Sequence, residues 1–179
     1  LSIKAGDLNR LNKSVLAEAL DSNIYVVFGA SYIKGWLIDF LVKNKAINIH
    51  MGISPYYRGS DCNFWALYDN NPHLVGGTIH MISKGLDSGP IIYHALAKKN
   101  KNSFIYSMLA VKSTIDSLVS KIKNNKLNLK KTTKQNKNNE IRYTRKSEFT
   151  DQVIKNFMKK KIKLHKLKKL KKIYINPTY

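Results

Sequence analysis

Residues 24–50 carry the pattern that most restricts the fold of this chain. A short apolar run at 24–28 is rich in β-branched residues, which predicts a strand buried on both faces. A turn follows at 29–31, and apolar residues then recur at helical spacing over 36–41. Residues 46–50 form a second short apolar segment. A strand, helix and strand joined by brief loops predict a parallel pair with a right-handed crossover, and therefore an α/β domain.

The remaining apolar segments extend this scheme. Helical spacing predicts helices over 7–20, 62–68 and 104–122. Apolar runs predict two further strands over 75–82 and 90–97, on either side of a glycine-containing loop.

Composition divides the chain into three parts. We predict a core domain over residues 1–122, a polar Lys- and Asn-rich linker over 123–147, and a basic helical segment over 148–179. The linker is expected to be loose, because it has few apolar residues to bury. The chain does not begin with Met and its first predicted element is a helix, so we expect the natural N-terminus to be missing.

The positive charge is concentrated in the second half of the chain. The net charge of +21 comes mostly from residues 100–179, which hold 22 Lys and Arg against 4 Asp and Glu. Such a field attracts polyanions such as RNA, nucleotides or anionic lipid. The simpler alternative is a compositional bias toward Lys and Asn, because no Arg or aromatic residues alternate regularly with the lysines.

Two further features bear on location. No apolar run in the sequence approaches the roughly 20 residues that span a bilayer. Cys62 is the only cysteine, so no internal disulfide can form. We therefore expect a cytoplasmic protein without a membrane span.

Three polar side chains indicate chemistry at the ends of the predicted strands. Asn48 and His50 are two apart in a strand, so they point to the same side, near the carboxyl end where α/β folds place ligands. Asp87 lies in the glycine-flanked loop between the two later strands. An amide, an imidazole and a carboxylate suit a reaction that passes through a tetrahedral oxyanion and moves a proton. We expect Asn48 and His50 to hold the oxyanion, and Asp87 to raise the pKa of His50 and to position a water that relays the proton.

Each part of this set also has a structural interpretation. A lone His at a strand end is more often a hydrogen-bonded structural residue than a catalyst. The stretch Gly-Leu-Asp-Ser-Gly-Pro at 85–90 is by itself a turn, in which Asp and Gly serve the turn geometry. The order of the pieces within a strand-helix-strand pattern favours the chemical interpretation.

Four motifs carry a resemblance to a known family. They are Ala46-Ile47-Asn48-Ile49-His50, Ser54-Pro55-Tyr56-Tyr57-Arg58-Gly59, Gly77-Thr78-Ile79-His80 and Gly85-Leu86-Asp87-Ser88-Gly89-Pro90-Ile91-Ile92. In this order they are similar to the core of the folate-dependent formyltransferases, shared by the glycinamide ribonucleotide, methionyl-tRNA and sugar N-formyltransferases. The resemblance implies a Rossmann-like formyltransferase fold with a largely parallel sheet, from which the N-terminal strands are missing.

The resemblance also implies a formyl donor and roles for individual residues. The donor is 10-formyltetrahydrofolate, without a metal, and the catalytic residues are Asn48, His50 and Asp87. The donor-binding residues are Phe28, Gly29, Ala30, Ser31, Tyr32 and Ile33 in one loop and Lys84, Gly85 and Leu86 in another. The residues expected to line the acceptor pocket are Tyr57, Arg58 and Trp65.

The implied reaction is transfer of a formyl group to an amino group, and three alternatives stay open for the function. The pair Phe64-Trp65 and residues 140–145 look more like the sugar N-formyltransferases, which favours a nucleotide-linked amino sugar as the acceptor. The basic second half suggests instead a methionyl-tRNA formyltransferase without its usual second domain. The third alternative is an inactive fold that serves as a basic RNA- or membrane-binding module. A homodimer is an open alternative for the oligomeric state.

Overall fold

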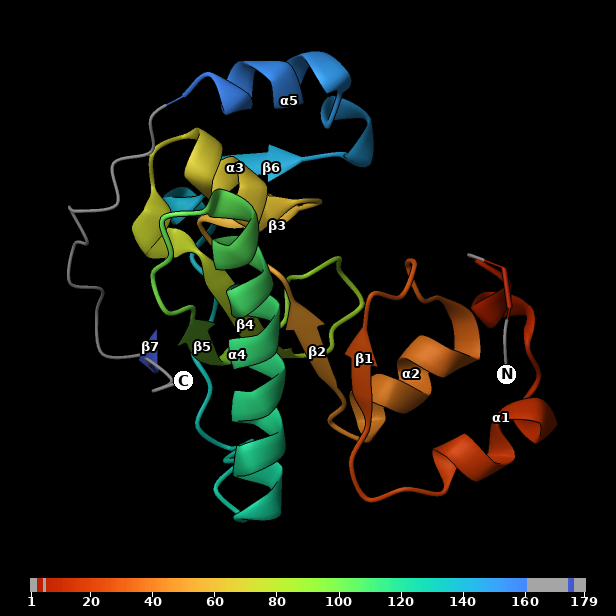
Figure 1. The fold of residues 1–179 in the computed structure, drawn as a ribbon. Helices are drawn as coiled ribbons and strands as arrows, with labels where there is room; N and C mark the ends of the chain where they lie inside the picture. The colour runs from red at the N-terminus through yellow and green to blue at the C-terminus, as the bar shows by residue number, and fades with distance from the viewer. Residues whose placement is uncertain (1–2, 5, 161–173, 176–179) are drawn as a thin grey trace.

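The computed structural model describes residues 3–4, 6–160 and 174–175 of the 179-residue chain (Figure 1). Within these residues, five strands form one sheet in the order β1-β2-β4-β5-β7. The strands are β1 (Val26–Phe28), β2 (Ile47–His50), β4 (Gly76–Met81), β5 (Ile91–Leu96) and β7 (Tyr174–Ile175). A two-stranded sheet pairs β3 (Tyr57–Gly59) with β6 (Arg142–Thr144).

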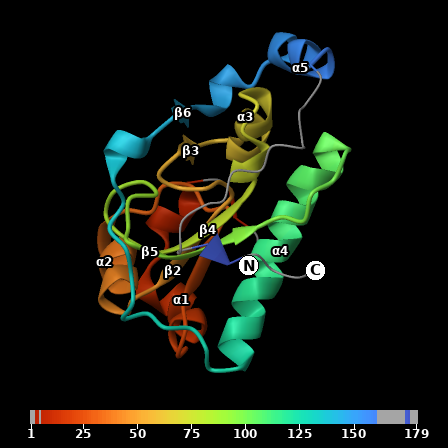
Figure 2. The ribbon, with the colours of Figure 1, turned by 90° about the vertical axis from the view of Figure 1, so that its left-hand side faces the viewer.

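Helices cover both faces of the large sheet, with α1 and α2 on one side and α4 on the other (Figures 1 and 2). The α-helices are α1 (Lys13–Leu20), α2 (Gly35–Lys43), α3 (Cys62–Tyr68), α4 (Ser103–Lys123) and α5 (Asp151–Met158). Short 3₁₀ helices lie at Asp7–Arg10, Pro72–Leu74, Lys137–Asn139 and Lys146–Glu148. The predicted α/β class is confirmed.

The helix expected over 7–20 is divided. Asp7–Arg10 is a 3₁₀ helix, and α1 begins only at Lys13. The reason is a local cap, because the Asn12 side chain accepts a hydrogen bond of 3.1 Å from the Val15 backbone N–H.

Alternation along β2 determines how the two helical layers attach. Ile47 and Ile49 pack with Leu118 of α4 on one side of the sheet. On the other side, Leu37 and Leu41 of α2 form a separate buried cluster. Burial of these two apolar sets holds the three layers together.

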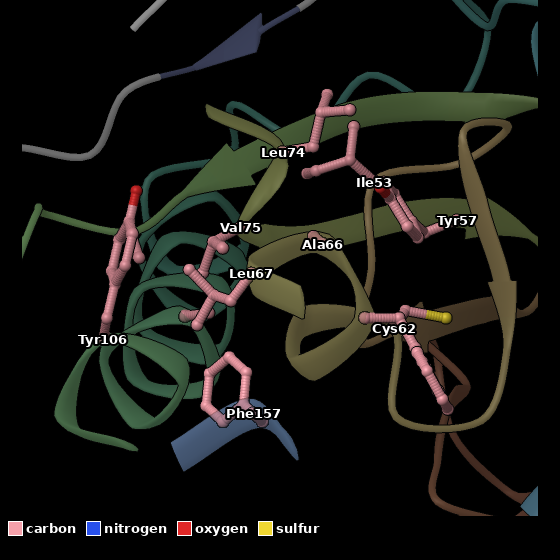
Figure 3. Packing of buried hydrophobic residues seen from close by; sticks show 12 residues of the cluster. Ile53, Tyr57, Cys62, Ala66, Leu67, Leu74, Val75, Tyr106 and Phe157 are labelled. Atoms are coloured by element: carbon pink, nitrogen blue, oxygen red, sulfur yellow. The ribbon is translucent and has the colours of Figure 1, made fainter. Parts of the chain in front are cut away.

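A third buried cluster surrounds α3 (Figure 3). Leu67 of α3 packs with Val75 ahead of β4 and with Phe157 of α5. Ile53, in the loop that follows β2, belongs to the same cluster and is fully buried. The chain that leaves the end of β2 is therefore fixed by packing.

The sheet is mixed, which corrects the expectation of a largely parallel sheet. β1 pairs with β2 and β5 with β7 in parallel, but β4 is antiparallel to both β2 and β5. Residues 82–90 join β4 to β5 directly, and so short a connection allows only antiparallel pairing.

β1 is an edge strand in the described part of the chain, where it pairs only with β2. Val26 is 42% exposed and Phe28 is 49% exposed. The expectation of a strand buried on both faces is therefore wrong here. A continuous apolar run predicts a strand of apolar side chains. It does not show how many neighbouring strands or helices cover that strand.

The segment expected to be a loose linker makes specific contacts with the core. Leu127 and Leu129 pack against the large sheet, and Thr133 exchanges two backbone hydrogen bonds with Ile91, of 2.7 and 2.8 Å. β6 lies in the same segment. The division of the chain into three domains stays a prediction.

The basic helical segment expected over 148–179 is described only in part. α5 covers residues 151–158, and residues 161–173 and 176–179 lie outside the described residues.

Candidate active site

β2 places Asn48 and His50 on the same side of the sheet. Their neighbours Ile47 and Ile49 face the α4 layer, so alternation turns Asn48 and His50 away from it. Across the antiparallel pair, Asn48 lies opposite His80 of β4. The strand and the shared side are as predicted.

The 83–89 loop brings Asp87 to both side chains. Asp87 Oδ2 lies 3.4 Å from His50 Nδ1, and Asp87 Oδ1 accepts a hydrogen bond of 3.1 Å from Asn48 Nδ2. Asp87 Oδ1 also lies 3.7 Å from His80 Nε2. The structure thus brings together the amide, the imidazole and the carboxylate, and it adds a second imidazole that the sequence reading had not singled out.

The Asn48 amide is held from two directions. Its Nδ2 lies 3.0 Å from His80 Nε2 and donates to Asp87. An amide nitrogen only donates, so His80 Nε2 accepts and the ring proton of His80 sits on Nδ1, which donates to the Met81 carbonyl at 2.8 Å. Both N–H groups of Asn48 therefore have partners. Donation to an oxyanion, the role expected for Asn48, requires that one of these bonds be given up.

The pKa of His50 is lowered overall, although the Asp87 charge raises it as expected. The side chain is 6% exposed, and burial, which disfavours the imidazolium, is the largest influence on its pKa. The Asp87 charge and the Tyr57 carbonyl oppose this effect without overcoming it. His50 is therefore neutral at pH 7.

The surroundings of His50 nevertheless prepare it to accept a proton. Its Nε2 lies 3.1 Å from the Tyr57 carbonyl, which can only accept a hydrogen bond, so the proton of the neutral ring belongs on Nε2. The Nδ1 lone pair then faces the Asp87 carboxylate. Protonation of Nδ1 would convert this repulsive contact into an ion pair, which is the property that a general base needs.

Asp87 stays ionised at neutral pH. Burial by itself would raise the pKa of this carboxyl, but interactions with the neighbouring His80, His50 and Arg58 side chains outweigh burial and lower it. The site therefore combines an anionic carboxylate with a neutral imidazole.

A pocket adjoins Asn48 and Asp87 on the side of the β1–α2 loop. Its volume is about 70 Å³. Six of the nine predicted donor-binding residues line it: Ala30, Ser31, Tyr32, Ile33, Gly85 and Leu86. Val27, Ile38 and Ile82 add apolar wall.

The other three predicted donor-binding residues are not among those that line this pocket. Phe28 lies on the edge strand, half-exposed. Gly29 forms the turn that follows it, with a φ of 65°. Lys84 contributes its carbonyl, which accepts a hydrogen bond of 2.7 Å from the Tyr32 hydroxyl, while its ammonium group pairs with Asp39 at the surface.

Of the three residues expected to line an acceptor pocket, only Arg58 faces the site. Its Nη2 donates to the Leu86 carbonyl at 2.9 Å, and its Nη1 pairs with Glu140 at 3.0 Å. Tyr57 is 1% exposed and Trp65 is 4% exposed, and both side chains belong to the core around α3. Tyr57 and Trp65 are thus near the catalytic motifs in sequence, but their side chains do not line the pocket beside Asp87.

A second cavity, of about 330 Å³, reaches His50 from the side of α3, α4 and α5. Aromatic and thioether side chains supply much of its lining: Phe64, Phe104, Met108, Phe149 and Phe157. Among the described residues that line it, Asp61 is the charged one. His50 thus lies between a pocket beside the carboxylate and a larger, mostly apolar cavity.

Three residues of the site were missed by sequence reasoning. His80 could have been found from the strand register, because it lies directly opposite Asn48. Gln135 and Glu140 come from the segment assigned as a linker, and they contact the Asp87 loop and Arg58 respectively. Nothing local in the sequence marks these two.

The fold and this side-chain set define an α/β domain with an amide, imidazole and carboxylate at the strand ends. The sequence model of the formyl transferase family matches residues 8–109, which is more than half of the chain. The chain therefore belongs to the formyl transferase family.

Two curated relatives match shorter stretches. Methionyl-tRNA formyltransferase of Thermodesulfovibrio yellowstonii is 42% identical over 50 residues, covering 28% of this chain and 16% of that protein. Formyltetrahydrofolate deformylase of Escherichia coli is 33% identical over 81 residues, covering 43% of this chain and 28% of that protein. The chain thus spans less than a third of the length of these curated relatives.

Two solved structures share the fold. The formyltransferase PseJ from Anoxybacillus kamchatkensis, in complex with UDP-4,6-dideoxy-4-formamido-L-AltNAc and tetrahydrofolate, has a TM-score of 0.55 at 22% identity, over 83% of this chain and 71% of that chain. Rv3404c, a likely sugar N-formyltransferase from Mycobacterium tuberculosis, has a TM-score of 0.59 at 22% identity, over 76% and 57%.

In the described part of the chain, no group of three His, Cys, Asp or Glu side chains is arranged to hold a metal ion. Every helix of that part is too short or too polar to cross a bilayer.

Proposed function

We propose that this chain transfers a formyl group from 10-formyltetrahydrofolate to an amino group. The observation that carries the proposal is the convergence of Asn48, His50 and Asp87 beside a pocket with apolar walls. Membership of the formyl transferase family supports it.

The pocket beside Asp87 suits a flat, partly apolar ring system. Ile33, Ile82 and Leu86 offer apolar contacts, and Ala30 and Ser31 allow a ring to approach the backbone closely. When bound, the folate supplies the formyl carbon that an amine attacks. The residues of this chain would then orient the two reactants and manage charge and protons.

Each member of the site has a distinct role in the proposal. His50, neutral and facing a carboxylate, takes the proton that the attacking amine must lose, and gives it to the folate nitrogen as the bond between that nitrogen and the formyl carbon breaks. Asp87 stabilises the resulting imidazolium by charge. Asn48 gives up one of its two hydrogen bonds within the protein and donates that N–H to the oxyanion instead. Before the oxyanion forms, His80 and Asp87 keep the Asn48 amide oriented.

For the acceptor, we propose a nucleotide-linked amino sugar. The structures that share the fold include the PseJ complex with a UDP-linked formamido sugar and a Helicobacter canadensis N-formyltransferase with dTDP-3-aminofucose. Arg58 lies beside the Asp87 loop and could face an anionic substrate, although Glu140 partly neutralises it. We keep the cytoplasm as the expected location.

The direct test is consumption of 10-formyltetrahydrofolate with a panel of nucleotide amino sugars, tRNA and buffer alone. Turnover that depends on one amino sugar supports the proposal. Formate release without any acceptor would point instead to deformylation of the donor, the activity named for the E. coli relative. No donor consumption with any acceptor would contradict the transferase function.

Aminoacylated methionyl-tRNA is the second candidate for the acceptor, and a basic surface of the chain favours it. Residues 121–137 hold seven lysines and no Asp or Glu. Six of these lysines are exposed: Lys123, Lys126, Lys130, Lys131, Lys134 and Lys137. Leu127 and Leu129 of the same stretch are turned into the core, so the surface is charged without apolar groups that would enter a membrane.

Salt dependence separates this candidate from the sugar acceptor. Contacts with phosphates predict tRNA affinity that falls steeply as salt rises, with a slope that grows with the number of lysines involved. Changing Lys126, Lys130, Lys131 and Lys134 together to Gln should reduce that slope and leave turnover of a small amine unchanged. If tRNA does not bind at moderate salt, this candidate is contradicted.

A further inference from the structure

The carbonyl groups of the Asp87 loop are held by side chains from three distant parts of the chain. The Tyr32 hydroxyl donates to the Lys84 carbonyl at 2.7 Å. Arg58 Nη2 donates to the Leu86 carbonyl at 2.9 Å. Gln135 Nε2 donates to the carbonyls of Asp87 and Gly89, at 2.8 and 2.7 Å. Tyr32 and Arg58 lie within the residues matched by the family model, and Gln135 lies beyond them.

Gln135 holds the catalytic carboxylate more directly than the other two residues. Its two hydrogen bonds use both N–H groups of one amide, and they end on the carbonyl of Asp87 itself and on that of Gly89. These two carbonyls flank the Asp87–Gly89 turn, so the amide clamps it from both ends.

The backbone at Asp87 needs such support. Its φ is +45°, in the left-handed region that residues with a side chain rarely occupy. Asp tolerates the left-handed conformation better than most residues do. The extended and right-handed conformations are nevertheless lower in free energy for Asp. A loop without a clamp would therefore tend to leave the conformation that aims the carboxylate at His50.

Gln135 can act as a clamp because its own backbone is fixed. Two residues earlier, Thr133 pairs with Ile91 of β5 through two backbone hydrogen bonds. Leu127 and Leu129 anchor the preceding stretch against the large sheet. Residues 127–135 thus form a strap that is attached to the large sheet, and the Gln135 side chain extends from this strap to the Asp87 loop.

We infer that Gln135 is a positioning residue for the reaction, which holds Asp87 in its left-handed conformation so that the carboxylate reaches His50 and Asn48. The inference rests on the proposed function for its catalytic consequence. Its structural consequence, an ordered 84–89 loop, is independent of that function.

The test replaces Gln135 in the full chain and measures turnover and amide hydrogen exchange together. Gln135→Leu removes both donors at similar size, and Gln135→Glu keeps the shape but replaces the donors with acceptors. For both variants we expect kcat to fall about 10- to 100-fold, as expected for two lost hydrogen bonds. We also expect faster exchange over residues 84–89 and unchanged exchange over 47–50.

A pH profile distinguishes positioning from simple loss of stability. If the carboxylate moves away from His50, a charge that raises the His50 pKa is weakened, and the acid limb of kcat/KM moves to lower pH. Gln152→Leu is the matched control, because within the described part of the chain the Gln152 side chain bonds to Asn156 of the same helix, α5. It should change none of these quantities.

Two results would overturn the inference. The first is unchanged kcat, pH profile and loop exchange in Gln135→Leu. The second is a general loss of thermal stability with no selective change at residues 84–89. If the native chain consumes no formyl donor, the proposed function fails, and the exchange measurement still decides whether Gln135 holds the loop.

Discussion

The end of β2 and the 83–89 loop contribute to the same site, but they are held in different ways. β2 is fixed by backbone ladders to β1 and β4 on its two sides and by the burial of Ile47 and Ile49. The loop lies outside the ladders and is fixed by side chains donated from Tyr32, Arg58 and Gln135. The strand thus presents its groups through regular structure, whereas the carboxylate depends on a few individual hydrogen bonds.

The largest effect is expected from the carboxylate itself. Asp87→Asn keeps the shape but removes the charge that stabilises imidazolium at His50, and we expect kcat to fall about 10²- to 10³-fold, comparable to the loss of one preorganised group in an active site. Steady-state turnover at saturating donor measures this. Asp116→Asn on α4, far from the site in the sheet layering, is the control and should keep full activity.

A core substitution in β2 tests whether regular structure alone holds the strand's part of the site. Ile47 is fully buried against the α4 layer, so Ile47→Ala should lower the free energy of unfolding by about 2–5 kcal/mol. Denaturant titration measures this loss. The remaining folded protein should turn over at the native rate, since the ladders still hold Asn48 and His50. A large fall in kcat per folded molecule would show that the strand is not as rigid as the comparison assumes.

The pH dependence sharpens the roles of His50 and Asp87. The folded pKa of His50 lies below 6.5, and the neutral form is the base, so activity is lost only as pH falls through that lowered value. The acid limb of kcat/KM should therefore lie below pH 6.5. In Asp87→Asn it should move lower still, because the main charge that raises the His50 pKa is gone. An acid limb above pH 6.5 would contradict a neutral His50.

The smallest effect concerns the outer end of the loop. Tyr32→Phe removes one hydrogen bond, to the Lys84 carbonyl, and we expect KM for the formyl donor to rise about 2- to 10-fold, the range for one such bond. Initial rates over a range of donor concentrations measure it. Tyr25→Phe loses a comparable bond to the Leu20 carbonyl, away from the site, and should leave KM unchanged.

Local regularity decides which parts of the fold and of the site could be predicted from the sequence. Asn48 and His50 were placed correctly because a strand turns alternate residues to one side, which is a local property. The exposure of β1 and the mixed sheet were missed, since both depend on which strands lie side by side. Tyr57 and Trp65 were assigned to a pocket but lie in the core, because proximity to a motif does not determine the direction of a side chain. Gln135 is recognisable only once the fold brings its strap to the loop.

The measurement that tests the central claim most directly is a single-turnover experiment with labelled 10-formyltetrahydrofolate and the acceptor identified from the panel. The mass of the acceptor is followed in the native chain and in Asp87→Asn. We predict a formylated amine that forms quickly with the native chain and about 10²- to 10³-fold more slowly with the variant. Equal rates of product formation in the two proteins, or label recovered only as formate, would contradict it.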